Sequence, residues 1–218
     1  KGGGYTEVLL DKSGKRLLDS DYTKIEVVYT YRDSIPYFEL LKNGRYGFYN
    51  PASQMFIAPK FDRINSFLFN IQQKNTILVT FGSKEGLVDI ITGKAIVPAL
   101  YDKIYGQDSL NKSLFIVGQE ERLGVYDALK KRLVVPLKYR YLSFTEDSDL
   151  LQASVNGLNG LVTTADKIVL PIAYFEIQVL DKGFYLLTTQ DSSYNNTFSF
   201  YDSKKRLLRK APDGTVAI

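Results

Sequence analysis

Short apolar runs separated by polar turns recur along the chain. The runs Leu114–Val117 and Leu123–Tyr126 are followed by the polar stretch Asp127–Lys131 and then by Leu133–Val135. Short runs of β-branched or aromatic residues bounded by turn residues predict β-strands. Because no stretch keeps the 3.6-residue period of a helix, we expect an all-β chain of short antiparallel strands.

Self-comparison shows that these runs belong to a repeat. Four of the seven prolines each follow two apolar residues, at Pro59, Pro98, Pro136 and Pro171, with spacings of 39, 38 and 35 residues. A glycine lies eleven or twelve residues before each proline, at Gly47, Gly86, Gly124 and Gly160. An aromatic residue follows each at Phe61, Tyr101, Tyr139 and Tyr174, and an aliphatic residue comes three positions later at Ile64, Ile104, Leu142 and Ile177. A fixed period of this length is typical of a tandem array.

Weaker copies of the repeat occupy both ends. Asp19 takes the proline position of the first copy and Glu7 its glycine position, while Ser199 takes the glycine position of the last copy. We expect about five full repeats and a partial one in a single domain, 1–218. Their approximate bounds are 7–43, 44–83, 84–120, 121–156, 157–196 and 197–218. The array is predicted to form a curved open array or a barrel-like roll, with a β-propeller as the alternative.

The repeating glycines and prolines have predicted structural roles. A glycine inside a strand indicates a bulge or the close approach of a neighbour, and we expect the aromatic residue of an adjacent repeat over it. The prolines are expected at strand ends, where a missing N–H breaks no ladder bond. Ser13-Gly14-Lys15 and Thr92-Gly93-Lys94 predict hairpin turns in which glycine supplies a positive φ.

The repeat resembles the WG-repeat family over nearly the whole chain. The segments that follow the family pattern most closely are Gly86-Leu87-Val88-Asp89, Gly93-Lys94, Ile96-Val97-Pro98 and Tyr101-Asp102-Lys103-Ile104. The family's Trp, however, is replaced by Tyr46, Glu85, Leu123 and Asn159. The resemblance implies a β-repeat scaffold in a divergent member, and it brings no catalytic residues.

The composition removes many kinds of chemistry. The chain has no His, Cys or Trp, which excludes Ser-His-Asp triads, Cys nucleophiles, the usual zinc ligand sets and iron–sulfur clusters. A net charge of +4 without a dense basic face is too weak to indicate nucleic-acid binding. No apolar run approaches the ~20 residues of a transmembrane helix. The sequence predicts no cofactor and no metal site.

Recurring acids are the remaining candidates for carboxylate chemistry. Asp62, Asp102 and Glu176 follow the repeat aromatic positions, and a second set, Asp89, Asp127, Asp166 and Asp202, lies near hairpin turns. They could bind a cation or sugar hydroxyls along one face. The simpler interpretation is that each carboxylate accepts backbone N–H bonds in a turn. Acids one repeat apart suit two-carboxylate catalysis poorly.

Basic and aromatic residues offer two further candidate surfaces. Lys204–Lys210 holds five charges that could bind an anionic partner, although a solvated hairpin is the simpler interpretation, and Lys130–Arg132 fills the equivalent turn. Tyrosines beyond those of the repeat could anchor a partner or pack between strands; they are Tyr29, Tyr31, Tyr37, Tyr46, Tyr49, Tyr105, Tyr126, Tyr141, Tyr185, Tyr194 and Tyr201.

Together these patterns predict a non-catalytic β-repeat binding or scaffold module, for a protein or glycan partner at the cell envelope. The alternatives are a carboxylate-based glycan-active enzyme on a propeller-like fold and a structural segment of a larger envelope protein. No catalytic or binding residue is assigned. The start Lys1-Gly2-Gly3-Gly4, without Met, indicates a trimmed or processed chain. We expect an extracytoplasmic protein, exported or lipid-anchored, with its N-terminal signal removed.

Overall fold

The structure, a computed structural model, describes residues 5–30, 34–66, 71, 73–146, 149–180, 184–202 and 207–211. These residues contain no helix and form 20 β-strands in five four-stranded sheets. The predicted all-β architecture of short antiparallel strands is therefore confirmed. Because the sheets are separate hydrogen-bonded groups, the described strands form no closed barrel.

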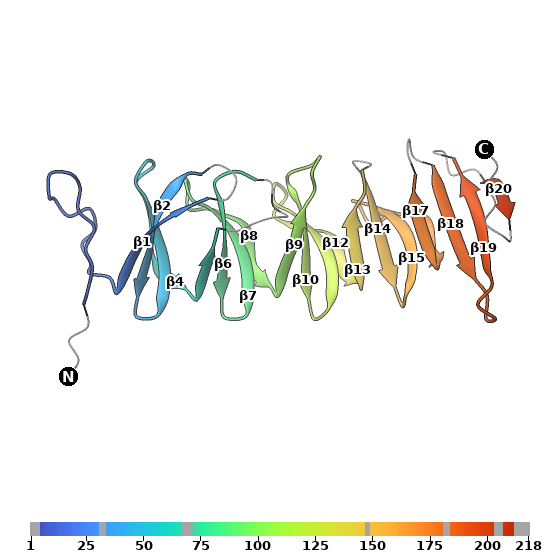
Figure 1. The fold of residues 1–218 in the computed structure, drawn as a ribbon, viewed down its shortest axis with the longest axis horizontal. Helices are drawn as coiled ribbons and strands as arrows, with labels where there is room; N and C mark the ends of the chain where they lie inside the picture. Colours follow the sequence, from blue (N-terminus) through green and yellow to red (C-terminus); the bar gives the residue numbers. More distant parts are fainter. Residues whose placement is uncertain are drawn as a thin grey trace. The chain divides into compact units, whose positions relative to one another are not determined.

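Each sheet takes four consecutive strands in chain order (Figure 1). Sheet 1 holds β1 (Lys24–Tyr29), β2 (Pro36–Lys42), β3 (Arg45–Asn50) and β4 (Met55–Phe61). Sheet 2 holds β5 (Arg63–Asn65), β6 (Thr76–Phe81), β7 (Lys84–Asp89) and β8 (Ala95–Tyr101). Sheet 3 holds β9 (Lys103–Gln107), β10 (Leu114–Gln119), β11 (Arg122–Asp127) and β12 (Arg132–Tyr139).

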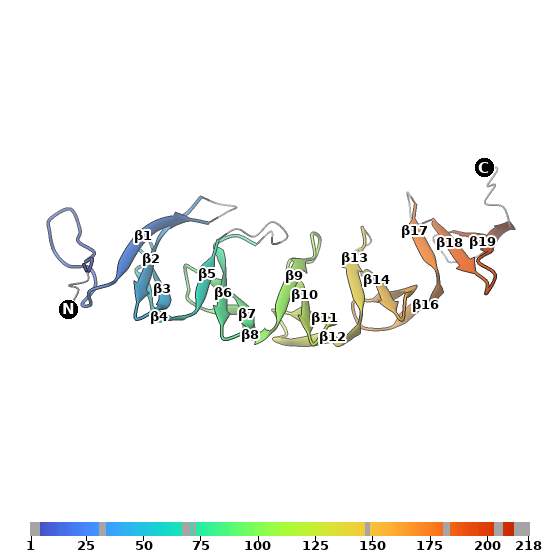
Figure 2. The ribbon, with the colours of Figure 1, turned by 60° about the horizontal axis from the view of Figure 1, so that its bottom comes forward.

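The last two sheets repeat this plan. Sheet 4 holds β13 (Tyr141–Phe144), β14 (Leu150–Val155), β15 (Leu158–Thr163) and β16 (Ile168–Tyr174). Sheet 5 holds β17 (Glu176–Val179), β18 (Tyr185–Gln190), β19 (Asn196–Tyr201) and β20 (Leu207–Ala211). Before β1, two isolated bridges, Glu7↔Tyr22 and Leu10↔Arg16, make residues 7–22 an irregular hairpin, which we call the N-terminal hairpin (Figure 2).

The chain divides into two compact units. Unit 1 comprises Lys1–Phe115 and unit 2 comprises Ile116–Ile218, and the division falls within β10. Unit 1 contains the N-terminal hairpin and sheets 1 and 2, whereas unit 2 contains sheets 4 and 5. The single domain 1–218 stays a prediction.

The sheets are offset by half a repeat from the units counted in the sequence. Sheet 1 takes its first two strands from the repeat 7–43 and its last two from 44–83. Each of the four repeats from 44–83 to 157–196 therefore spans two sheets. The register also corrects the alignment of the first copy: Glu7 pairs with Tyr22 as Glu85 pairs with Tyr101, so Glu7 occupies the position before the glycine.

The repeat glycine and proline form one bulge, which recurs in sheets 1 to 4. In sheet 1, Tyr46 pairs with Phe61 and Phe48 with Ile57, so two steps along β3 face four along β4. The same offset occurs between β7 and β8, β11 and β12, and β15 and β16. The prolines thus lie inside the fourth strands and not at strand ends, because the extra residues of a bulge leave the ladder.

Glycine is required where this bulge crosses the third strand. A Cβ on Gly47 would lie 2.3 Å from the Ile57 carbonyl oxygen, and one on Gly124 would lie 2.6 Å from the Val135 carbonyl oxygen. The predicted close approach is confirmed. However, the three atoms nearest to each repeat glycine belong to the paired strand, and not to an aromatic ring as expected.

The hairpin turns also share a backbone conformation. Gly14 and Gly93 have φ of 85° and 68°, as predicted, and Gln54, Lys131 and Asp166 take the same left-handed conformation at the equivalent turn position. Acids cap these turns: Asp89 Oδ1 accepts hydrogen bonds from the Ile91 and Thr92 amides.

The core lies between neighbouring sheets within each unit. In unit 1, Tyr37 and Phe48 of sheet 1 cluster with Ile77 and Val88 of sheet 2. In unit 2, Leu161 of sheet 4 clusters with Tyr185 of sheet 5. Phe61 and Ile64 belong to the first cluster, and Tyr174 and Ile177 belong to the second, so the repeat aromatic and aliphatic residues are part of the core at both junctions.

Candidate binding surface

The recurring acids after the repeat aromatic residues are held by neighbouring groups. Asp62 forms an ion pair with Arg45 and accepts a hydrogen bond of 2.7 Å from the Gly82 amide. That amide bond holds the pKa of Asp62 below its usual value. Asp102 pairs with Lys84 at 2.7 Å, while Glu176 is exposed on β17. The turn-type interpretation is therefore the better one for Asp62.

The turn acids divide into two kinds. Asp89 and Asp127 cap their own hairpins through backbone amides. Asp166 instead reaches sheet 3, where its carboxylate accepts bonds from Tyr139 Oη at 2.7 Å and Lys138 Nζ at 2.6 Å. Burial raises the pKa of the Tyr139 hydroxyl. Asp166 is therefore a link between two sheets of unit 2.

The residue before the repeat glycine, at the family's Trp position, makes hydrogen bonds to a neighbouring part of the chain in three copies. Glu85 Oε2 accepts a 2.9 Å bond from the Ile104 amide, and Glu7 Oε2 accepts one of 2.6 Å from the Ile25 amide. In unit 2, Asn159 Nδ2 donates to the Phe175 carbonyl oxygen at 2.8 Å. Polar side chains at the family's Trp position thus reach the first strand of the next sheet or the segment before it. Sequence spacing gave no sign of these bonds.

Two further positions lie side by side at one end of sheets 1 to 4, and we call them the strand-end pair. One is the residue two places before the repeat glycine, and the other directly follows the repeat aromatic residue. In unit 1 they are Arg45 with Asp62 and Lys84 with Asp102, both ion pairs. In sheet 3 both positions are basic, Arg122 and Arg140, and Arg140 forms an ion pair with Glu121, the residue before Arg122.

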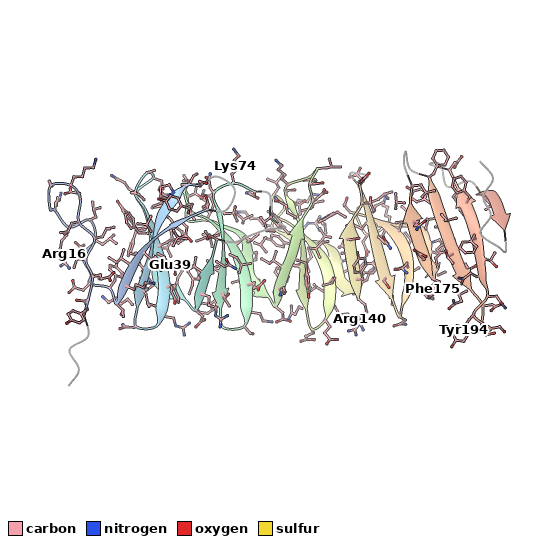
Figure 3. All side chains as sticks on the ribbon, viewed as in Figure 1. Arg16, Glu39, Lys74, Arg140, Phe175 and Tyr194 are labelled. Atoms are coloured by element: carbon pink, nitrogen blue, oxygen red, sulfur yellow. The ribbon has the colours of Figure 1, made fainter. Side chains whose placement is uncertain are left out.

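Sheet 4 replaces this ion pair with apolar side chains. The strand-end pair there is Leu158 and Phe175, which are 41% and 48% exposed. The pairings Tyr141↔Ser154, Ser154↔Asn159 and Asn159↔Tyr174 run in one row across the sheet, and Leu158 and Phe175 lie one step beyond it. Figure 3 labels Phe175. We call Leu158 and Phe175 the sheet 4 patch.

The tyrosines outside the repeat position divide between buried and exposed sites. Buried examples are Tyr37, Tyr49, Tyr126 and Tyr185. Tyr29, Tyr105, Tyr141 and Tyr194 are exposed, and Tyr194 lies at the β18–β19 turn (Figure 3). Tyr31 lies outside the described residues.

The structure also brings together two acids that sequence reasoning missed. Glu26 of β1 lies directly opposite Glu39 of β2, which Figure 3 labels. Burial, and then the charge of Glu26, raise the pKa of Glu39, while Lys24 Nζ bonds Glu26 Oε2 at 2.6 Å. Strand register is what places them together, and the sequence repeat does not report it.

The basic segments are only partly described. Lys130 Nζ lies 3.2 Å from Asp127 Oδ2 in the β11–β12 turn, in agreement with the turn interpretation. Lys204–Arg206 lie outside the described residues. Within the described part of the chain, no group of three or more acidic, His or Cys residues could hold a metal ion, and no helix has the length and apolarity to cross a membrane.

Comparisons with known proteins agree with the repeat. The family described as WG containing repeat matches residues 46–70, which confirms the predicted resemblance in the repeat that keeps an aromatic residue, Tyr46, at the Trp position. No curated protein matches the chain.

Several solved structures show a distant likeness. They include Kluyveromyces lactis Hsv2p, at 14% identity and a TM-score of 0.39, with 85% of this chain and 63% of that one covered. The WD40 domain of Toxoplasma gondii coronin has 10% identity and a TM-score of 0.40, with coverage of 95% and 61%. The uncharacterized protein lmo1340 of Listeria monocytogenes EGD-e has 12% identity and a TM-score of 0.40, with coverage of 86% and 65%. This chain spans less than two thirds of each.

Proposed function

We propose that the chain is a non-catalytic binding module whose unit 2 binds a protein partner through the sheet 4 patch. The observation that carries this proposal is the exposed apolar strand-end pair Leu158–Phe175, at a position that is charged in sheets 1 to 3. Phe175 is an exposed aromatic side chain, a residue type that is enriched at protein interfaces. The repeat fold supplies a rigid surface for it.

The test replaces the patch with the chemistry of sheet 2. The double variant Leu158→Lys/Phe175→Asp copies the Lys84–Asp102 pair and should fold normally while losing the partner. Ile168→Lys, at an exposed site at the other end of the same sheet, is the matched control and should keep it. Quantitative affinity purification from the native source identifies proteins that only the double variant loses, and titration with the purified partner then measures Kd. Equal capture by both variants would refute the proposal.

The second candidate is a carboxylate-based glycan-active enzyme, and the specific observation for it is Glu39 opposite Glu26. A half-buried acid of raised pKa beside a second carboxyl group is an arrangement that glycosidases use. The predicted candidates Asp62 and Asp102 are engaged in ion pairs and suit this role less well. Turnover in a glycosidase screen that vanished in Glu39→Gln or Glu26→Gln would favour the enzyme over the binding module.

We also propose that the module acts outside the cytoplasm at the cell envelope. Fractionation of the native cells, with sequencing of the protein's N-terminus, tests this location. Recovery from the cytosol with an intact initiating Met would refute it.

A further inference from the structure

A cavity of about 520 Å³ lies in unit 1 between the N-terminal hairpin and the β3–β4 hairpin. This volume is within the ~300–1,000 Å³ range of small-molecule sites. Its main lining side chains are Lys15, Arg16 and Asp19 from the N-terminal hairpin and Tyr49, Gln54 and Phe56 from sheet 1. Figure 3 shows Arg16 on the segment before β1.

The next junction in the same unit shows how this space is normally filled. Gly93, in the β7–β8 turn of sheet 2, lies against the fourth strand of sheet 1. A Cβ there would be 2.7 Å from Met55 Sδ and 3.5 Å from Ile57 Cδ1. The turn and the apolar side chains therefore pack directly against each other.

At the first junction the equivalent residues are different. Counted from the proline position, Gln54 corresponds to Gly93, and Lys15 and Leu17 correspond to Met55 and Ile57. Gln54 keeps the left-handed turn conformation at φ 55°, which costs a non-glycine residue of order 1 kcal/mol. All three side chains line the cavity. The cavity thus occupies the space that corresponds to the Gly93–Met55 contact between sheets 1 and 2.

The sheet 1 wall of the cavity is aromatic. Tyr49 and Phe56 pair across β3 and β4, so they share one face of the sheet. Phe56 is 43% exposed, and Tyr49 is buried beside it and stacks on Phe38 with ring centroids 6.4 Å apart. Phe56 is therefore a supported and accessible ring on which a flat apolar ligand face can lie.

The opposite wall carries charges that cancel. Its two basic residues, Lys15 and Arg16, are balanced by the acids Asp11 and Asp19. Asp11 is engaged by the Ser13 and Lys15 amides, and Arg16 pairs with Asp21. The side chains of Lys15, Asp19 and Gln54, all within the described residues, make no hydrogen bond or ion pair. For a ligand, Lys15 and Gln54 offer donors and Asp19 and Gln54 offer acceptors, and the charges of Lys15 and Asp19 cancel.

We propose that this cavity binds a neutral carbohydrate, with one sugar ring stacked on Phe56. Each hydroxyl both donates and accepts, so it needs the mixture that Lys15, Gln54 and Asp19 provide. An anionic ligand would gain from the two basic residues but would face two carboxylates. This site is separate from the sheet 4 patch, and neither proposal depends on the other.

The experiment titrates the full chain with the neutral trisaccharides maltotriose, cellotriose and triacetylchitotriose, and with the anionic trigalacturonate, by saturation-transfer NMR and calorimetry. At least one neutral trisaccharide should bind, and Phe56→Ala should raise the Kd for that sugar by about tenfold. Phe81→Ala, at a ring 56% exposed in sheet 2, should change Kd by less than about twofold.

A second variant separates binding from folding. Lys15→Met/Gln54→Gly copies the closed junction of sheet 2, so it should lose the sugar while keeping the melting temperature or raising it. The proposal is overturned if no neutral trisaccharide binds, if trigalacturonate binds better than all three, or if Phe56→Ala and the double variant bind as the unchanged chain does.

Discussion

Sheet 2 in unit 1 and sheet 4 in unit 2 have the same backbone plan but different side chains at two places. Both have four strands in chain order and the same glycine–proline bulge. Their strand-end pairs differ, because sheet 2 has Lys84 with Asp102 and sheet 4 has Leu158 with Phe175. The two sheets therefore share the backbone that the repeat specifies and differ in the side chains at their exposed strand ends.

The turn position that faces the preceding sheet differs in the same way. Gly93 packs against Met55 in unit 1, whereas Asp166 bonds Lys138 and Tyr139 in unit 2. One junction is apolar and the other is polar, on the same left-handed turn. The backbone conformation is thus compatible with either chemistry.

The largest expected effect tests whether the two backbones are equivalent. Gly86→Ala and Gly160→Ala should each cost about 3 kcal/mol of unfolding free energy, because the new Cβ would come within 2.9 Å and 2.7 Å of the bulged strand. Urea unfolding followed by circular dichroism measures both. Gly44→Ala, in open space at φ 72°, is the control and should cost only about 1 kcal/mol. A small cost at Gly160 alone would show that sheet 4 has a different bulge.

The next effect concerns the polar junction. Tyr139→Phe removes the hydroxyl that donates to Asp166 and should cost about 1 kcal/mol in urea unfolding. A double-mutant cycle with Asp166→Asn should show coupling between the two residues, since they touch. Additive costs would mean that this bond contributes nothing to joining sheets 3 and 4.

A smaller, pH-dependent effect distinguishes sheet 1 from sheet 4. Glu26↔Glu39 is a like-charge pair, whereas the equivalent residues of sheet 4 are Ser143↔Gln152. Because burial raises the pKa of Glu39 in the folded state, protonation stabilises the fold, and this contribution is lost as the pH rises through the raised pKa. Glu39→Gln should therefore raise the melting temperature at pH 7 and leave it unchanged below the unfolded pKa, ~4.3. Gln152→Glu should lower it at pH 7. A pH-independent gain from Glu39→Gln would contradict this account.

The smallest effect on stability is expected at the strand-end pairs. Leu158→Lys/Phe175→Asp should change the unfolding free energy by no more than about 0.5 kcal/mol, because exposed ion pairs contribute little. Its effect should appear in partner binding instead. A cost above ~2 kcal/mol would show that Leu158 and Phe175 belong to the core and not to a binding surface.

Much of the fold was predictable from the repeat, because strand runs, turns and close approaches each leave a local signature. Gly47 indicated a bulge or a close approach, and Gly93 indicated a turn with positive φ, and both are confirmed. The prolines were misplaced at strand ends, since a bulge and a strand end both tolerate a missing N–H. Glu7 was misaligned by one position, because spacing alone does not give the pairing register.

The candidate sites were less predictable, because they depend on side chains that the repeat does not constrain. Leu158 and Phe175 are seventeen positions apart in the sequence. The cavity beside Phe56 follows from a missing contact between two hairpins, which no local pattern records. Asp62 and Asp102 drew attention by recurring, yet in the structure each forms an ion pair at the end of its sheet.

The sequence by itself determined the kind of element, its repetition and the positions where only glycine fits, because steric and turn preferences act within a few residues. The tertiary structure alone decided which strands share a sheet, which acids oppose each other and which apolar side chains stay exposed. Those outcomes depend on strand register and on packing between sheets. Both join residues that lie far apart in the chain, and both are free to differ from one sheet to the next.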